Sequence, residues 1–217
     1  MHDERLYQRQ RADLVDELRL KGIRDERVLA AIGQVPRHRF VDLALRSRAY
    51  RDEALPIGLK QTISQPFTVA YQTMLLDVRP GDRILEIGTG SGYQAAILCE
   101  LGARVFSIER HRPLLDRTRT ILDALSYRVV TRHGDGTLGW SSVAPFDGVI
   151  VTAAAAEVPE ALKEQLRSPN DGALGGRLVI PVGHSKGQVM TLILRMGPDT
   201  FHAEESHTFR FVPLISG

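Results

Sequence analysis

The fold is decided by one stretch of the sequence, which reads Arg83-Ile84-Leu85-Glu86-Ile87-Gly88-Thr89-Gly90-Ser91-Gly92-Tyr93. A short run of apolar, partly β-branched residues is followed at once by a cluster of glycines, which is typical of a buried strand that ends in a tight turn. The three glycines carry no Cβ, so the backbone of the turn can approach a ligand closely. The residues from Ser91 onward favour a helix, so the turn lies at a helix N-terminus.

A glycine-rich turn of this kind can hold either of two cofactor classes. The dinucleotide fingerprint G-x-G-x-x-G requires glycine or alanine at its sixth position, where this chain has Tyr93. Here an acid, Glu86, stands two residues before the first glycine. This pattern resembles the first motif of the class I methyltransferases that use S-adenosylmethionine. The resemblance implies that the methionine end of that cofactor contacts Glu86, Gly88, Thr89, Gly90 and Gly92; an ordinary strand-to-helix turn is the structural alternative.

A second predicted strand, Arg104 to Ile108, ends in Glu109, which follows Gly92 by 17 residues. In nucleotide-binding α/β folds an acid at this place accepts hydrogen bonds from both ribose hydroxyls. The spacing therefore favours a cofactor site over a solvated surface glutamate.

Length and composition favour one α/β domain and exclude several classes of function. The chain has 217 residues, 28 basic against 26 acidic, and a formal charge of +2, so we expect neither nucleic acid nor a membrane as a partner. The single cysteine, Cys99, excludes an internal disulfide and is compatible with the cytoplasm. We expect no signal peptide, since no hydrophobic region follows the N-terminus, and no metal, since the histidines lack ligand spacing. We also expect a monomer.

The chain begins with two predicted helices within residues 9–35, which Gly22 ends and Asp25 begins. Residues 50–66 contain prolines and a glycine that rule out a regular helix, yet they are chemically varied. A long irregular loop inside a compact domain is usually functional, so we expect such a loop here. A helix over 68–78 precedes the first strand.

The same region carries a specific resemblance. Tyr50-x-Asp52, Leu55-Pro56-Ile57-Gly58 and Gln61-Thr62-Ile63-Ser64-Gln65-Pro66 resemble the substrate and cofactor loop of the protein-L-isoaspartate O-methyltransferases. The resemblance implies that Ile63 and Ser64 contact the cofactor. It also implies that Ile57 and Ser64 contact the substrate.

Strands and helices alternate along the rest of the chain. After Glu109 we expect a helix over 112–125, a helix over 159–166, and strands at 129–131, 146–152, 177–181, 188–195 and 208–213, with a turn at 183–187. This order predicts a doubly wound, mostly parallel seven-stranded sheet, Rossmann-like and preceded by N-terminal helices, with ligands at the carboxyl ends of the strands. The residues expected at those ends or in the adjoining loop are Ser64, Gly88, Glu109, Asp135 and Thr152.

The family resemblance extends from about residue 9 to residue 214. It implies that Gly134-Asp135-Gly136 contacts the adenine, that Thr152 and Ala153 line the substrate pocket, and that Gln188 contacts the cofactor or closes the site. Residues 167–176 depart from the family pattern, and we expect a mobile loop there. The single domain of residues 1–217 then divides into helices and substrate loop (1–79), cofactor-binding core (80–167) and C-terminal strands (168–217).

The activity that the resemblance implies is methyl transfer from S-adenosylmethionine to the free α-carboxylate of isoaspartyl residues in damaged proteins, which then revert through a succinimide. A carboxylate is ionised at neutral pH, so no general base is needed. Ser64 is the candidate catalytic residue because its hydroxyl can position that carboxylate; loop structure is the alternative role. Two other functions stay open, a methyltransferase for another acceptor and a binding module without turnover.

Overall fold

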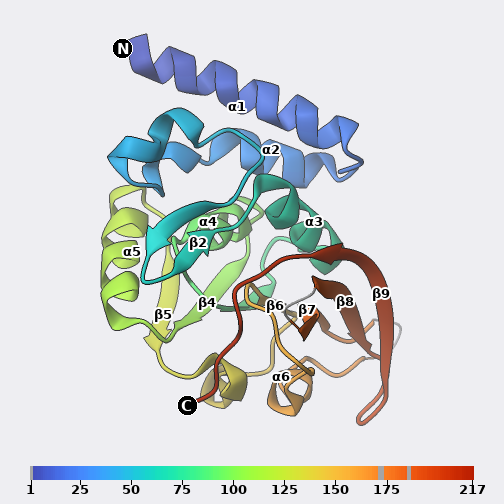
Figure 1. The fold of residues 1–217 in the computed structure, drawn as a ribbon. Coiled ribbons are helices and arrows are strands. Elements are labelled where there is room, and N and C mark those ends of the chain that lie inside the picture. The colour runs from blue at the N-terminus through green and yellow to red at the C-terminus, as the bar shows by residue number, and fades with distance from the viewer. Residues whose placement is uncertain (1, 171–173, 185–186) are drawn as a thin grey trace.

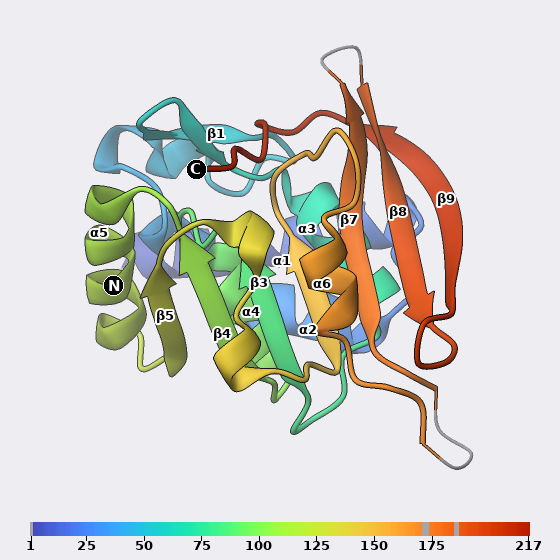
Figure 2. The same ribbon diagram turned by 90° about the horizontal axis from the view of Figure 1, so that it is seen from below.

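Seven strands form one sheet through the centre of the molecule (Figures 1 and 2). The structure is a computed structural model that describes residues 2–170, 174–184 and 187–217. The strands lie in the order β5 (Val129–His133), β4 (Arg104–Glu109), β3 (Arg83–Ile87), β6 (Gly148–Val151), β7 (Arg177–His184), β8 (Gly187–Arg195) and β9 (Phe201–Phe209). The pairings from β5 to β7 are parallel, and β8 and β9 are antiparallel. The predicted mostly parallel, seven-stranded sheet is confirmed.

Two hydrophobic cores lie on opposite faces of this sheet, because successive strand residues point to opposite sides. On β3, Ile84 enters one core and Leu85 the other. Figure 2 shows α6 on one face and α1 to α4 on the other. The helices are α1 (His2–Leu20), α2 (Glu26–Gln34), α3 (Pro66–Leu76), α4 (Tyr93–Glu100), α5 (Arg112–Ala124) and α6 (Glu160–Glu164), with 3-10 turns η1 (Arg37–Arg39), η2 (Leu43–Arg48), η3 (Gly136–Leu138) and η4 (Ser141–Val143).

The predicted irregular loop at 50–66 is wrong in part, since it contains a small hairpin, β1 (Leu55–Gly58) and β2 (Gln61–Ile63). The turn residues Leu59 and Lys60 have φ of +50° and +59°, which bulky residues rarely adopt, so the sequence lacks the usual glycine or asparagine of such a turn. Burial of apolar side chains on both strands stabilises the hairpin instead.

The predicted last strand at 208–213 is also wrong in part, because β9 begins at Phe201 and ends at Phe209. Most of β9 is exposed and polar, as on an edge strand, so it shows no apolar alternation, whereas the apolar residues 211–215 continue across the carboxyl ends of the strands (Figure 2). The expectations for the 167–176 loop and the 183–187 turn fall partly on 171–173 and 185–186, which lie outside the described residues.

A buried arginine joins the N-terminal region to the loop that carries Ser64. Arg37 of η1 is fully buried. Its guanidinium donates to the carbonyl of Ala49 at 2.8 Å, of Ser64 at 2.8 Å and of Glu53 at 3.3 Å. It also lies 4.7 Å from the ring centre of Tyr93, the first residue of α4. One side chain therefore holds the loop that carries Ser64 against the helix that follows the glycine turn.

We expect Arg37→Met to lower the free energy of unfolding by roughly 2–4 kcal/mol, because it leaves buried carbonyl groups without donors. Urea denaturation measures the change. Arg48→Met is the matched control, since Arg48 is 43% exposed and pairs with Glu53 at the surface, so its loss should stay below about 1 kcal/mol. Equal losses in the two variants would contradict the structural role of Arg37.

Candidate active site

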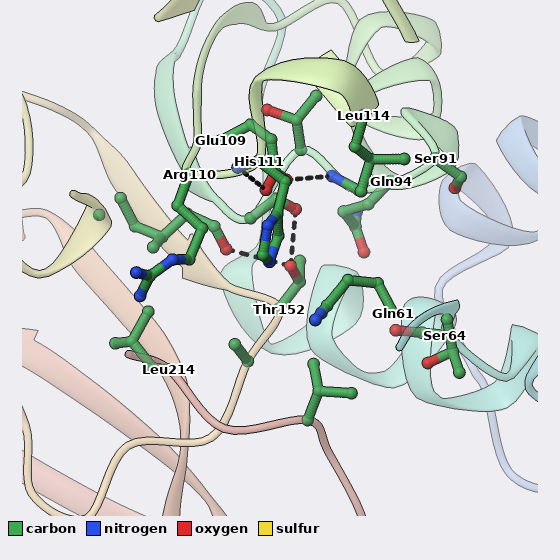
Figure 3. A pocket seen from close by; sticks show the side chains of 18 of the residues that line it. Gln61, Ser64, Ser91, Gln94, Glu109, Arg110, His111, Leu114, Thr152 and Leu214 are labelled. Atoms are coloured by element: carbon green, nitrogen blue, oxygen red, sulfur yellow. Dashed lines mark hydrogen bonds between the residues drawn. The ribbon is translucent and has the colours of Figure 1, made fainter. Parts of the chain in front are cut away.

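A cavity lies at the carboxyl ends of the parallel strands (Figure 3). The loops after β2, β3, β4, β5 and β6 form its wall together with the C-terminal residues 212–215. Parallel strands bring the loops after their carboxyl ends to one edge of the sheet, which is where ligands bind in open α/β folds. The sequence-based expectation that the site lies at this edge agrees with this position.

The glycine turn needs its glycines for two different reasons. The φ angles of Gly88, Gly90 and Gly92 are +94°, +53° and +87°, a region that glycine adopts readily. A Cβ on Gly88 would lie 2.5 Å from Thr152 Oγ1, and one on Gly92 would lie 2.7 Å from Thr118 Cγ2. A Cβ on Gly90 would meet its nearest neighbours only at 3.8 Å. Packing therefore requires the outer glycines, and the middle one keeps the cavity side of the turn open.

Glu109 fastens this turn from the end of β4. One carboxylate oxygen accepts from the backbone N–H of Gly90 at 2.9 Å, and the other accepts from the N–H of His111 at 2.9 Å. The side chain is only 5% exposed and lines the cavity. The acid predicted for the ribose therefore lies between the glycine turn and the start of α5 (Figure 3).

Glu86, in contrast, does not line the cavity. Its carboxyl is fully buried behind the turn and accepts a hydrogen bond from the Ser107 hydroxyl, which in turn lies 2.7 Å from Thr89 Oγ1. Burial raises the pKa of Glu86 to about 8, repulsion from Glu109 adds to the rise, and the Ser107 hydrogen bond opposes it. Glu86 is thus protonated at neutral pH, and its assignment to the cofactor stays a prediction.

The structure brings together nine of the fifteen predicted site residues. Those that line the cavity are Ile63, Ser64, Gly88, Thr89, Gly90, Glu109, Gly136, Thr152 and Ala153. Those that do not are Ile57, Glu86, Gly92, Gly134, Asp135 and Gln188.

Two of the residues outside the cavity support its wall. Asp135 accepts hydrogen bonds from the N–H groups of Thr137 and Gly217. Gln188 accepts from the N–H of Phe211 at 2.9 Å and donates to the carbonyl of His184. Both residues therefore hold neighbouring segments rather than line the cavity.

Several lining residues were not predicted from the sequence. They are Gln61, Gln94, Arg110, His111, Leu114 and residues 212–215. Gln94 could have been found, since the second residue of a helix that follows a glycine turn lies beside the space that the turn opens. Residues 212–215 could not, because the predicted last strand takes in residues 212 and 213 and an apolar run gives no sign of lying over a cavity.

A second cavity adjoins the first. Its walls are formed by Phe67 and Thr68 at the start of α3 and by residues 208–212. Ser64 and Thr152 line both cavities, and so do Thr62 and Val212. The two spaces therefore meet at the hydroxyl-bearing residues that sequence analysis assigned to the substrate.

The loop that carries Ser64 is held at its far side by Asp52. The Asp52 carboxylate accepts from the N–H of Phe67 at 2.7 Å and from the Gln65 side-chain amide at 2.9 Å. Lys21 of α1 pairs with the same carboxylate at 2.6 Å. Since Arg37 holds the carbonyl of Ser64, two charged side chains from the N-terminal region fix this loop.

Neither a metal cluster nor a membrane span is found in the part of the chain that the structure describes. There, no group of three or more His, Cys, Asp or Glu side chains could hold a metal ion. Within the same residues, no helix is both long and apolar enough to cross a bilayer.

We expect Glu86→Gln to gain stability over the wild-type chain as pH rises from about 4.5 to about 8. Below this window the carboxyl is protonated whether the chain is folded or not. Within it the unfolded carboxyl ionises while the folded one keeps its proton, so wild-type stability falls, by up to roughly 1 kcal/mol per pH unit.

Urea denaturation of both proteins between pH 5 and pH 8 measures the difference. Burial lowers the pKa of His38 to about 4, which gives stability the opposite slope below about pH 6.5. This contribution is common to both proteins and cancels in the comparison. A difference that does not change with pH would contradict the raised pKa.

Comparison with known proteins places these features in a family. The model of the protein-L-isoaspartate (D-aspartate) O-methyltransferase family matches residues 9–217. A protein-L-isoaspartate O-methyltransferase of Salinibacter ruber is 64% identical over 217 residues, which cover 98% of this chain and 94% of that protein. The corresponding protein of Christiangramia forsetii is 50% identical and covers 99% of this chain and 98% of its own length.

Solved structures agree with the sequence comparison. A protein-L-isoaspartate O-methyltransferase structure, 27% identical, superimposes with a TM-score of 0.82 over 94% of this chain and 65% of its own. A Plasmodium falciparum protein in complex with S-adenosyl-L-homocysteine, 23% identical, has the same fold, with a TM-score of 0.80 over 95% of this chain and 99% of its own. With the family model and these relatives covering nearly its whole length, the chain belongs to the protein-L-isoaspartate O-methyltransferase family.

Proposed function

We propose that this protein transfers the methyl group of S-adenosylmethionine to the free α-carboxylate of L-isoaspartyl residues in damaged proteins and peptides. The observation that carries the proposal is the pair of cavities that meet at Ser64 and Thr152. One cavity has the glycine turn and acid of a nucleoside site, and the other opens beside it toward the surface strand β9. A donor in the first cavity and a peptide in the second would meet at these two residues.

The residues of the first cavity fit S-adenosylmethionine. The Glu109 carboxylate lines this cavity, and beside its two backbone hydrogen bonds its oxygens keep lone pairs that can accept from two ribose hydroxyls. Gly90 leaves room for the cofactor on the open side of the turn. Leu114 and Leu214 provide apolar surface for the adenine. When bound, the cofactor supplies an activated methyl group on a sulfonium.

The protein then has to orient the acceptor and remove water. The acceptor carboxylate is ionised at neutral pH, so the site needs no general base. In this proposal the Ser64 hydroxyl donates a hydrogen bond to that carboxylate; its position on the wall of both cavities supports this role, and Arg37 binds the Ser64 carbonyl at 2.8 Å. The small side chain of Ala153, on the wall of the first cavity, leaves space for the carboxylate to approach. Proximity and orientation alone can supply several kcal/mol of the rate enhancement.

We also propose that the protein acts as a monomer in the cytoplasm, without nucleic acid or membrane as a partner. The near-neutral charge balance and the single cysteine support this proposal.

We expect an isoaspartyl peptide to be methylated at least about 100-fold more efficiently than the aspartyl peptide of the same sequence. The two peptides carry the same charge and differ by one methylene between backbone and carboxylate, so only geometry separates them. A misplacement of about 1 Å can cost on the order of 100-fold in rate. Initial rates with a radiolabelled donor measure the ratio. Equal rates would refute the repair activity, as would turnover of a small metabolite alone.

We expect Ser64→Ala to lower kcat for the isoaspartyl peptide by roughly 10-fold or more, the effect of losing one hydrogen bond to a charged group. Cofactor affinity should change much less, because the lost contact is to the acceptor. Ser206→Ala is the matched control, since Ser206 bonds the carbonyl of Met190 and lines neither cavity. If kcat is the same in both variants, Ser64 only shapes its loop.

A further inference from the structure

Gln94 places an oxygen without a partner against the wall of the cofactor cavity. It is the second residue of α4, which begins directly after the glycine turn. Its side chain is 94% buried, since its relative exposure is 6%, and it lines the cavity. Among the residues that the structure describes, its Oε1 atom accepts no hydrogen bond. A buried amide oxygen normally accepts a hydrogen bond, so we expect a bound ligand to supply the donor.

The hydrogen bonds around Gln94 fix which end of the amide faces the cavity. The hydroxyl of Thr73 on α3 donates to the carbonyl of Val69 at 2.7 Å. A threonine hydroxyl has only one hydrogen, so toward Gln94 this hydroxyl can only accept. Nε2 of Gln94 lies 3.0 Å away and donates to it. The amide cannot be flipped without losing this bond, and the group offered to the cavity is therefore an acceptor.

Gln94 lies at the end of the cavity beside the glycine turn, to which the family resemblance assigns the methionine end of the cofactor. Figure 3 shows it on the same side as Ser91, Gln61 and Ser64, away from Arg110 and Leu214. Glu109, which the proposed function assigns to the ribose, is the acidic residue among those that line the described cavity. Glu86 is protonated and lies behind the turn. No carboxylate of the described wall therefore faces this end.

Three backbone acceptors of the glycine turn already have donors. The carbonyl of Gly88 accepts from the Thr152 hydroxyl at 2.7 Å, and that of Gly90 accepts from the Thr118 hydroxyl at 2.6 Å. The carbonyl of Thr89, between them, accepts from the N–H of Gly92 at 2.8 Å. The Gln94 Oε1 atom differs from these three carbonyl oxygens because it accepts no hydrogen bond from the described residues.

We propose that Gln94 is a cofactor-positioning residue whose Oε1 accepts a hydrogen bond from the α-ammonium group of S-adenosylmethionine. The ammonium is a donor without acceptor capacity, which matches the orphaned oxygen. This contact orients the amino-acid arm of the cofactor. The proposal rests on the cofactor of the proposed function and is independent of the methyl acceptor.

The test is a binding cycle in which protein and ligand each lose one partner of the contact. The ligands are S-adenosylhomocysteine and its analogue with hydrogen in place of the amino group, titrated calorimetrically at pH 7. We expect Gln94→Met to reduce the preference of the protein for the amino ligand by about 10-fold or more, the effect of one hydrogen bond to a charged group. A preference that stays as in the wild-type chain would overturn the proposal.

Gln72→Met is the matched control. Gln72 is equally buried, belongs to α3 and donates to the carbonyl of Val151, but it does not line the cavity. Gln72→Met should leave the preference for the amino ligand within about two-fold of that of the wild-type chain. A change of this size is expected when the mutated residue and the ligand group do not interact. If Gln72→Met lowers this preference as much as Gln94→Met does, replacement of any buried glutamine in this region has the same effect. That result would overturn the specific role of Gln94.

Gln94→Glu decides the question if Gln94→Met does not fold. It keeps an acceptor and adds a negative charge, so the preference for the amino ligand should equal or exceed that of the wild-type chain. A preference that falls instead would overturn the proposal. If the wild-type chain does not bind S-adenosylhomocysteine at all, the proposed function is overturned together with the role of Gln94. If it binds but the preference does not depend on Gln94, only the role of Gln94 is overturned.

Discussion

The site depends on a backbone constraint, a turn of five residues between β3 and α4 in which the three glycines have positive φ. Such a turn opens space for a ligand, but its three glycines contribute no side chains that could hold its shape. Side chains from other elements do so: Glu109 binds the N–H of Gly90, Thr118 binds its carbonyl, and Thr152 binds the carbonyl of Gly88. They come from the end of β4, from α5 and from the end of β6. The cavity therefore forms only when the parallel sheet is assembled.

The second cavity depends on charged side chains that precede its lining residues in the sequence. Arg37 and Asp52 reach the loop around Ser64 from the segment between α2 and β1, and Lys21 of α1 pairs with Asp52. Residues 64 and 65 belong to neither a helix nor a strand. These side-chain contacts therefore fix the backbone there, as helix or sheet hydrogen bonds do elsewhere. The N-terminal helices thus take part in the site without lining it.

Much of this could be predicted from the sequence, and the failures have physical causes. β3, β4 and the acid at the end of β4 were predictable because buried parallel strands give apolar runs that end in recognisable turns. β9 was not, because an exposed edge strand carries polar residues on both faces, while the apolar residues 211–215 only cross the cavity. The burial of Glu86 behind the turn was also hidden, since position in a motif does not tell which side of a strand a carboxyl faces. The hydrogen-bond network that leaves the Gln94 oxygen free required coordinates.

The most direct test of this account is a crystal structure of the protein with S-adenosylhomocysteine and an isoaspartyl peptide bound together. The account predicts that the sulfur lies in the first cavity and the peptide in the second, with the isoaspartyl α-carboxylate within hydrogen-bond distance of the Ser64 hydroxyl and on the Thr152 side of the junction. A carboxylate bound elsewhere, with Ser64 and Thr152 both free of ligand, would contradict it.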